Sequence, residues 1–161
     1  MILNADEILE IAEQIERNGI AFYEGAAERF QGGEKRTLLG LANMERNHER
    51  AFASMRRELA DADEGLKAFD PEGEAGKYLA AIADGQIFDL KADPLELLGP
   101  QESVQSILEL AIGMEKDSVV FYVAIRDSVP ESLGKDRIEK IIKEEMDHVI
   151  LLNEMLSSMA K

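Results

Sequence analysis

Apolar residues recur at steps of three and four along four long stretches of this chain, which is the spacing of a helix with one buried face. We predict helices over about 4–31, 34–62, 102–129 and 134–158. Asn4, with Glu7 three positions later, is typical of a helix N-cap. Four helices of this length predict an all-α four-helix bundle, and 161 residues suit a single domain over 1–161.

The stretch between the second and third helices, residues 65–100, holds three of the four prolines. Asp70-Pro71 and Asp93-Pro94 each have the pattern of an N-cap followed by proline at the first helical position, which predicts two short helices. A connection of this length can run the full length of a bundle. We therefore expect the second and third long helices to be parallel neighbours in an up-down-down-up arrangement.

The chain repeats itself. The inward positions of the second helix match those of the fourth with an offset of 100: Leu38, Leu41, Glu45, His48, Phe52, Met55 and Leu59 against Ile138, Ile141, Glu145, His148, Leu152, Met155 and Met159. Those of the first helix match the third with an offset of 99: Leu9, Ala12, Glu16, Gly19, Tyr23 and Ala26 against Leu108, Ala111, Glu115, Ser118, Tyr122 and Ile125. The pattern indicates a duplicated helix pair.

Each apolar stripe is interrupted by one glutamate near its middle, and the second and fourth helices add a histidine three positions later. Residues three apart share a helix face, so each Glu-x-x-His pair points at one place. The chain has only two histidines, and both occupy equivalent positions of the repeat. The interrupting residues are Glu16, Glu45, His48, Glu115, Glu145 and His148.

Four inward carboxylates would cost several kcal/mol each if they stayed ionised without partners. They can share protons, pair with basic residues or bind cations. The stripes carry no Lys or Arg, so ion pairing is the weakest option, and two divalent ions would balance the four negative charges. Mixed oxygen and imidazole ligands suit iron or manganese, because calcium and magnesium rarely take histidine and structural zinc prefers a closed tetrahedral site.

Charge and composition restrict the classes of partner and of chemistry that are possible for this chain. Lys and Arg number 18 against 33 Asp and Glu, a net charge of −15 that argues against nucleic acid and anionic membranes and suits cations, a basic partner or solubility alone. The absence of cysteine excludes disulfides, thiol catalysis and iron–sulfur clusters. The N-terminus lacks the pattern of a secretory signal and no stretch is apolar enough to span a membrane, so we expect a cytoplasmic protein.

At these residues the chain resembles the ferritin-like superfamily of di-iron carboxylate proteins and, within it, rubrerythrin-like proteins that lack a rubredoxin domain. The likeness extends over all four helices. It implies two iron ions, with manganese or zinc as substitutes: Glu16 and Glu115 as terminal ligands, Glu45 and Glu145 as bridges, and His48 and His148 on one iron each. It also implies that Tyr23 and Tyr122 orient carboxylates by hydrogen bonds, although these residues are equally well explained as core aromatics.

Two departures from rubrerythrins affect the expected activity. There is no cysteine-rich electron donor, and Ser118 stands where rubrerythrins carry a further glutamate. The resemblance implies reduction of hydrogen peroxide with electrons from a separate donor protein, in a homodimer. The alternatives are an iron-handling protein that oxidises Fe(II) with dioxygen and a metal-stabilised scaffold without catalysis. Beside the ligands, Asn47, Glu144 and Asp147 are placed to hold an imidazole N–H, but a solvated helix face is the favoured interpretation of each.

Overall fold

A computed structural model describes residues 4–62, 73–74, 77–78, 96, 98–100 and 102–159 of the chain. Within them the long helices are α1 (Ala5–Ala27), α2 (Gly32–Ala60), α5 (Val104–Arg126) and α6 (Lys135–Met159), and a short 3₁₀ turn, η2 (Glu131–Leu133), precedes α6. The prediction of an all-α bundle is confirmed. The two short helices expected within 65–100 fall almost entirely outside the described residues.

Local sequence explains where α1 begins and ends. Asn4 and Glu7 form a capping box, in which the Asn4 side chain accepts from the Glu7 N–H at 2.9 Å and the Glu7 carboxylate accepts from the Asn4 N–H at 2.8 Å. The helix ends at Ala27, earlier than the predicted bound of 31, and the chain turns so that Phe30 enters the core. Gly32 then opens α2 with φ of 61°, a conformation that favours glycine.

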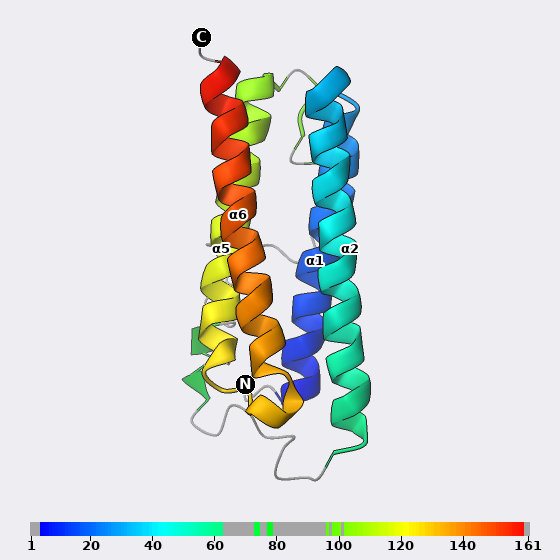
Figure 1. The fold of residues 1–161 in the computed structure, drawn as a ribbon, viewed down its shortest axis with the longest axis vertical. Helices are drawn as coiled ribbons and strands as arrows, with labels where there is room; N and C mark the ends of the chain where they lie inside the picture. The colour runs from blue at the N-terminus through cyan, green and yellow to red at the C-terminus, as the bar shows by residue number, and fades with distance from the viewer. Residues whose placement is uncertain are drawn as a thin grey trace.

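The helices run up, down, down and up, as predicted (Figure 1). Most of the packing lies within the pairs α1–α2 and α5–α6, and the pairs meet through α1 against α5 and α2 against α6. The expectation that the second and third long helices are neighbours is wrong, because α2 and α5 are parallel but lie on the diagonal of the bundle. The side chain of Arg29, just after α1, donates to the Gly99 carbonyl at 3.1 Å, so the end of the crossover lies beside the end of α1.

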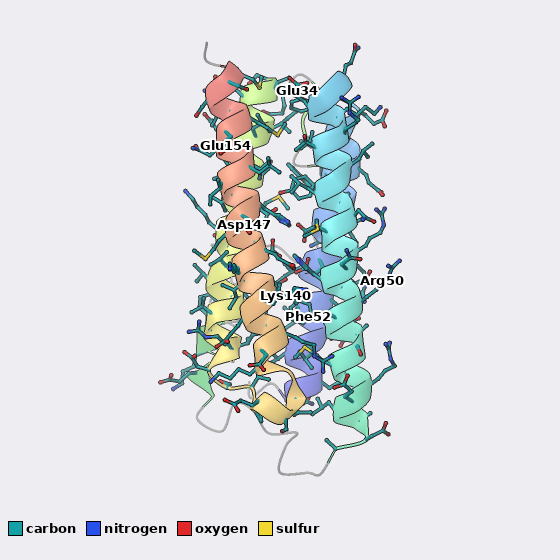
Figure 2. All side chains as sticks on the ribbon, viewed as in Figure 1. Glu34, Arg50, Phe52, Lys140, Asp147 and Glu154 are labelled. Carbon is teal, nitrogen blue, oxygen red and sulfur yellow. The ribbon has the colours of Figure 1, made fainter. Side chains whose placement is uncertain are left out.

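The apolar core is divided into two clusters along the bundle. One contains Phe52, Phe121 and Ile138, and the other contains Phe22 and Leu152. Side chains such as Phe52 point into the bundle, whereas Arg50 on the same helix points outward (Figure 2). Between the clusters lies a layer of buried polar residues. None of the helices in the described part of the chain has the length and apolar character needed to cross a membrane.

Candidate metal centre

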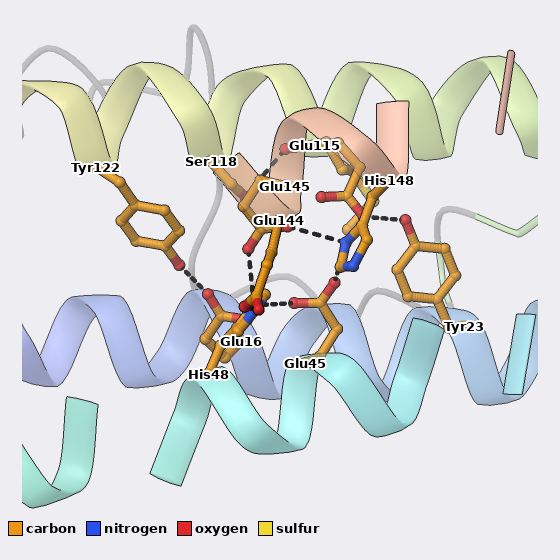
Figure 3. A network of polar contacts seen from close by, with 11 residues as sticks. Glu16, Tyr23, Glu45, His48, Glu115, Ser118, Tyr122, Glu144, Glu145 and His148 are labelled. Carbon is orange, nitrogen blue, oxygen red and sulfur yellow. Dashed lines mark hydrogen bonds and ion pairs between the residues drawn. The ribbon is translucent and has the colours of Figure 1, made fainter. Parts of the chain in front are cut away.

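The polar layer brings together all six residues that interrupt the apolar stripes (Figure 3). Each helix contributes one glutamate, α2 and α6 add one histidine each, and every one of these residues is at most 4% exposed. Their ligand atoms form two overlapping groups, each with atoms within 4.8 Å of one another: Glu16, Glu45, His48 and Glu145, and Glu45, Glu115, Glu145 and His148. Because Glu45 and Glu145 belong to both groups, they occupy the bridging positions between two possible ions.

Both imidazoles turn the same nitrogen toward the carboxylates. His48 Nδ1 lies 3.1 Å from Glu145 Oε1 and 3.5 Å from Glu16 Oε2. His148 Nδ1 lies 3.0 Å from Glu145 Oε2 and 3.3 Å from both Glu45 Oε1 and Glu115 Oε1. The two rings are stacked, with centroids 5.8 Å apart. The geometry therefore presents one nitrogen and several carboxylate oxygens at each of two adjacent positions.

The unsatisfied atoms of the layer indicate what fits between these residues. The five buried atoms without a hydrogen-bond partner in the described structure are Glu16 Oε2, Glu45 Oε1, Glu145 Oε2, His148 Nδ1 and His148 Nε2. His148 Nδ1 is close to three carboxylates, yet none is aligned for a hydrogen bond. Buried polar atoms normally have partners. Convergent oxygen and imidazole atoms without partners form a site that suits two metal ions.

Protons balance the charge of this layer when metal is not bound. Burial, together with the charges of Glu45 and Glu145, raises the pKa of both Glu16 and Glu115 well above its usual range. Burial opposes ionisation of Glu145 as well, but the two imidazoles beside its carboxylate hold its pKa below the usual range. For His148, desolvation is outweighed by the surrounding carboxylates, which raise its pKa to about 12. These pKa shifts favour neutral carboxyl groups at Glu16 and Glu115 and protonated imidazoles at His48 and His148.

The two tyrosines form reciprocal hydrogen bonds between the helix pairs. Tyr122 on α5 donates to Glu16 on α1, and Tyr23 on α1 donates to Glu115 on α5 (Figure 3). Both phenols are fully buried, and burial followed by the adjacent carboxylate raises the pKa of each, so both stay protonated donors. Each hydroxyl therefore fixes one oxygen of a glutamate that the resemblance to di-iron carboxylate proteins implies as a terminal ligand.

Comparisons with known proteins agree with this geometry. A solved structure from Thermotoga maritima, described as a candidate ferritin-like diiron-carboxylate protein, matches with a TM-score of 0.75 and 27% sequence identity over 98% of this chain and 97% of that one. The chain resembles the ferritin-like diiron-carboxylate proteins in fold and in its buried cluster. No protein-family model and no curated protein matches it.

Two small residues of the repeat shape the buried cluster. A Cβ atom added at Gly19 would lie 3.3 Å from Glu45 Cγ, so glycine leaves room for the bridging position of that carboxylate. The equivalent residue in the other half is Ser118, whose hydroxyl donates to the Met114 carbonyl of its own helix at 3.1 Å. Ser118 therefore directs its hydroxyl along the helix.

Sequence reasoning underestimated Glu144. It lies 2.8 Å from His48 Nε2, on the side of the ring opposite the cluster, and is thus an acceptor that orients the imidazole. Asn47 and Asp147, the other two candidates, are exposed. The sequence position of Glu144 could have indicated this role, because Glu144 directly precedes Glu145 on a helix that faces α2. The residue equivalent to Glu144 in the other half is Met44, and His148 Nε2 has no hydrogen-bond partner among the described residues.

Proposed function

We propose that this chain binds two iron ions in the buried cluster and uses them to reduce hydrogen peroxide with electrons from a separate donor. The observation that carries the proposal is the convergence of four carboxylates and two imidazoles, with buried atoms of Glu16, Glu45, Glu145 and His148 that lack a hydrogen-bond partner among the described residues. Mixed oxygen and nitrogen ligands with shared carboxylates suit iron, and manganese or zinc would be substitutes.

The residues divide into three roles. Glu45 and Glu145 lie in both groups and would bridge the ions. Glu16 with His48 would complete one position, and Glu115 with His148 the other: each pair belongs to one group only. The hydrogen bonds from the tyrosines and to Glu144 keep these ligands in place, and burial of the cluster excludes bulk water.

Reduction of one peroxide molecule to two water molecules consumes two electrons and two protons. Two Fe(II) ions in the site would supply one electron each. The chain has no cysteine, so it cannot hold a thiol or iron–sulfur relay of its own. The two electrons must therefore be returned by an external carrier. The likeness to rubrerythrins at the ligand positions supports peroxide as the oxidant.

The test uses protein loaded anaerobically with Fe(II) and mixed rapidly with peroxide or dioxygen at equal concentration. We expect reoxidation by peroxide to be the faster of the two, followed in the optical spectrum of the iron. Faster reoxidation by dioxygen would contradict the peroxidase assignment. Absence of any valence change with either oxidant, together with a lower melting temperature after metal removal, would identify a structural site.

A second function, oxidation of Fe(II) as a substrate, is favoured by Ser118. Rubrerythrins carry a further glutamate at the corresponding position, whereas the Ser118 hydroxyl bonds to its own helix. The ligand set is therefore more symmetrical than that of rubrerythrins. With excess Fe(II) under air, this function predicts oxidation of many more than two iron ions per chain; the peroxidase function predicts that oxidation stops once the site is filled.

A further inference from the structure

A groove of about 370 Å³ lies between α2 and α6 and ends at His48 and Glu144, on the outer side of the ligand cluster. Its lining includes Asn47, His48, Ala51, Arg137, Lys140 and Glu144. His48 is only 2% exposed and forms the inner end, with Nδ1 toward the ligand cluster and Nε2 toward Glu144. A molecule in this groove is thus separated from the cluster by one imidazole ring and one carboxylate.

The groove contains basic residues in a chain of net charge −15. Arg137 is held by Glu58 at 2.5 Å. The Nζ atom of Lys140, a residue of α6 labelled in Figure 2, lies 3.8 Å from Glu144 Oε1. This ammonium group offers Glu144 a second partner if the carboxylate swings away from His48. The side chain of Glu144 is 27% exposed, so it lies at the boundary between the groove and the buried site.

The internal repeat shows that these features belong to one half only. In the other half, Leu151 is equivalent to Ala51, Gly40 to Lys140 and Thr37 to Arg137. A leucine thus stands where the groove has alanine, and neutral residues stand where it has cations. The six ligands are the same in both halves, so metal binding alone does not account for this difference.

We propose that the groove is the access site for small anions that bind at the metal position next to His48. In this arrangement Ala51 sets the width, the cations Arg137 and Lys140 attract the anion, and Glu144 closes the inner end. The inference rests on the proposed dinuclear metal site and goes beyond the proposed function, because hydrogen peroxide is uncharged at neutral pH whereas the groove is assigned to small anions. It does not require that peroxide be the physiological oxidant.

The test measures azide binding to the full chain loaded with Co(II), followed by stopped flow in the optical spectrum of the metal. Ala51→Leu, which copies the other half of the repeat, should slow azide association by more than about ten-fold because the added carbons fill the groove. Lys140→Glu should lower the association rate by about three-fold at low ionic strength, and the difference should vanish at high salt.

Two matched controls isolate the groove. Lys143→Glu makes the same charge change at an exposed position of α6 outside the lining, and Leu151→Ala alters the equivalent position of the other half. Both should bind azide at the rate of the unmodified chain. Each variant should retain two Co(II) ions and its melting temperature, which shows that the fold and the site are intact.

Three results would overturn the inference. They are wild-type azide kinetics in Ala51→Leu, equal effects of Lys140→Glu and Lys143→Glu, or slower Co(II) loading in Ala51→Leu with faster loading in Lys140→Glu. The last result would make the groove a route for the metal ion itself. The proposed function fails separately: slow reoxidation by peroxide with groove-dependent azide binding would reject the peroxidase and leave the access site standing.

Discussion

The two halves of the metal centre match at the ligands and differ directly around them. Around His48 and around His148, glutamates approach from equivalent helices of the repeat at similar distances, Glu16 of α1 near His48 and Glu115 of α5 near His148. One step farther out, His48 has Glu144 on its second nitrogen, whereas the equivalent neighbour of His148 would be Met44. The groove beside Ala51 likewise belongs to the His48 side.

This comparison separates two kinds of constraint on a duplicated sequence. The ligands are held alike because each ion needs a similar set of oxygen and nitrogen atoms. The surroundings are free to diverge, and they do so where the site approaches the surface. The two halves of the cluster therefore share their carboxylate and imidazole groups but differ in the hydrogen bonding of the histidines and in the residues beside them.

The largest expected effect comes from the residues that the two positions share. Glu45→Ala and Glu145→Ala should each abolish binding of at least one ion, because either change removes a carboxylate from both groups. Metal content after anaerobic loading provides the measurement. Two tightly bound ions in either variant would show that the glutamate is not a bridge.

Acidity should affect the two positions equally. The pKa values of Glu16, Glu115 and His148 are raised, and that of His48 is also raised by its carboxylates, so metal ions compete with protons at these four residues. Metal affinity should therefore rise with pH and fall on acidification, because protons compete with the ions for the same atoms.

Calorimetric titrations in buffers of different ionisation enthalpy count these protons directly. Release of two protons with each ion would show that the half-sites are electrostatically alike. An unequal division would locate the asymmetry in the ligands themselves, and release of no protons would contradict the protonation pattern.

Glu144→Met makes the His48 side copy the other half of the repeat. Loss of the carboxylate on His48 Nε2 should weaken one of the two metal affinities by about ten-fold or more and leave the other nearly unchanged. Stepwise titration with Co(II) separates the two events. The reciprocal variant, Met44→Glu, tests whether the His148 side can gain what the first variant loses; equal weakening of both positions in Glu144→Met would refute the asymmetry.

The smallest effect should come from the tyrosines, where the halves match most closely. Tyr122→Phe removes the hydrogen bond to Glu16, and Tyr23→Phe removes the one to Glu115. Each change should lower the affinity of its own position by about five-fold, the value of one hydrogen bond. A strong effect of one variant and none of the other would show that the tyrosines are not equivalent.

Sequence periodicity was sufficient for the helices and for the convergence of the six ligands. Glu45 and His48 had to share a face because they are three residues apart, and the repeat required Glu145 and His148 to do the same. The diagonal placement of α2 and α5 could not be read this way, because periodicity shows which face of a helix is buried and leaves its neighbours undetermined. The use of the six convergent residues as metal ligands stays a prediction.

The role of Glu144 and the presence of the groove could not be predicted from the sequence either. Glu144 lies at the edge of the buried face, where a carboxylate is equally compatible with solvent. The groove depends on Ala51 being small and on how far apart α2 and α6 lie, and neither spacing nor residue type reports that distance. The repeat did contain one indication, since Ala51 in one half and Leu151 in the other differ in side-chain volume.

The division of the core into two apolar clusters has a consequence for cooperativity. A helical bundle usually opens from its ends, where packing is thinnest. In this chain the apolar packing is also interrupted at mid-length, where carboxyl, imidazole and phenol groups take the place of apolar side chains between the helices. Metal ions that bridge four helices at that level would couple the two ends into one unfolding unit, so amide exchange in the central turns should slow more on loading than exchange elsewhere.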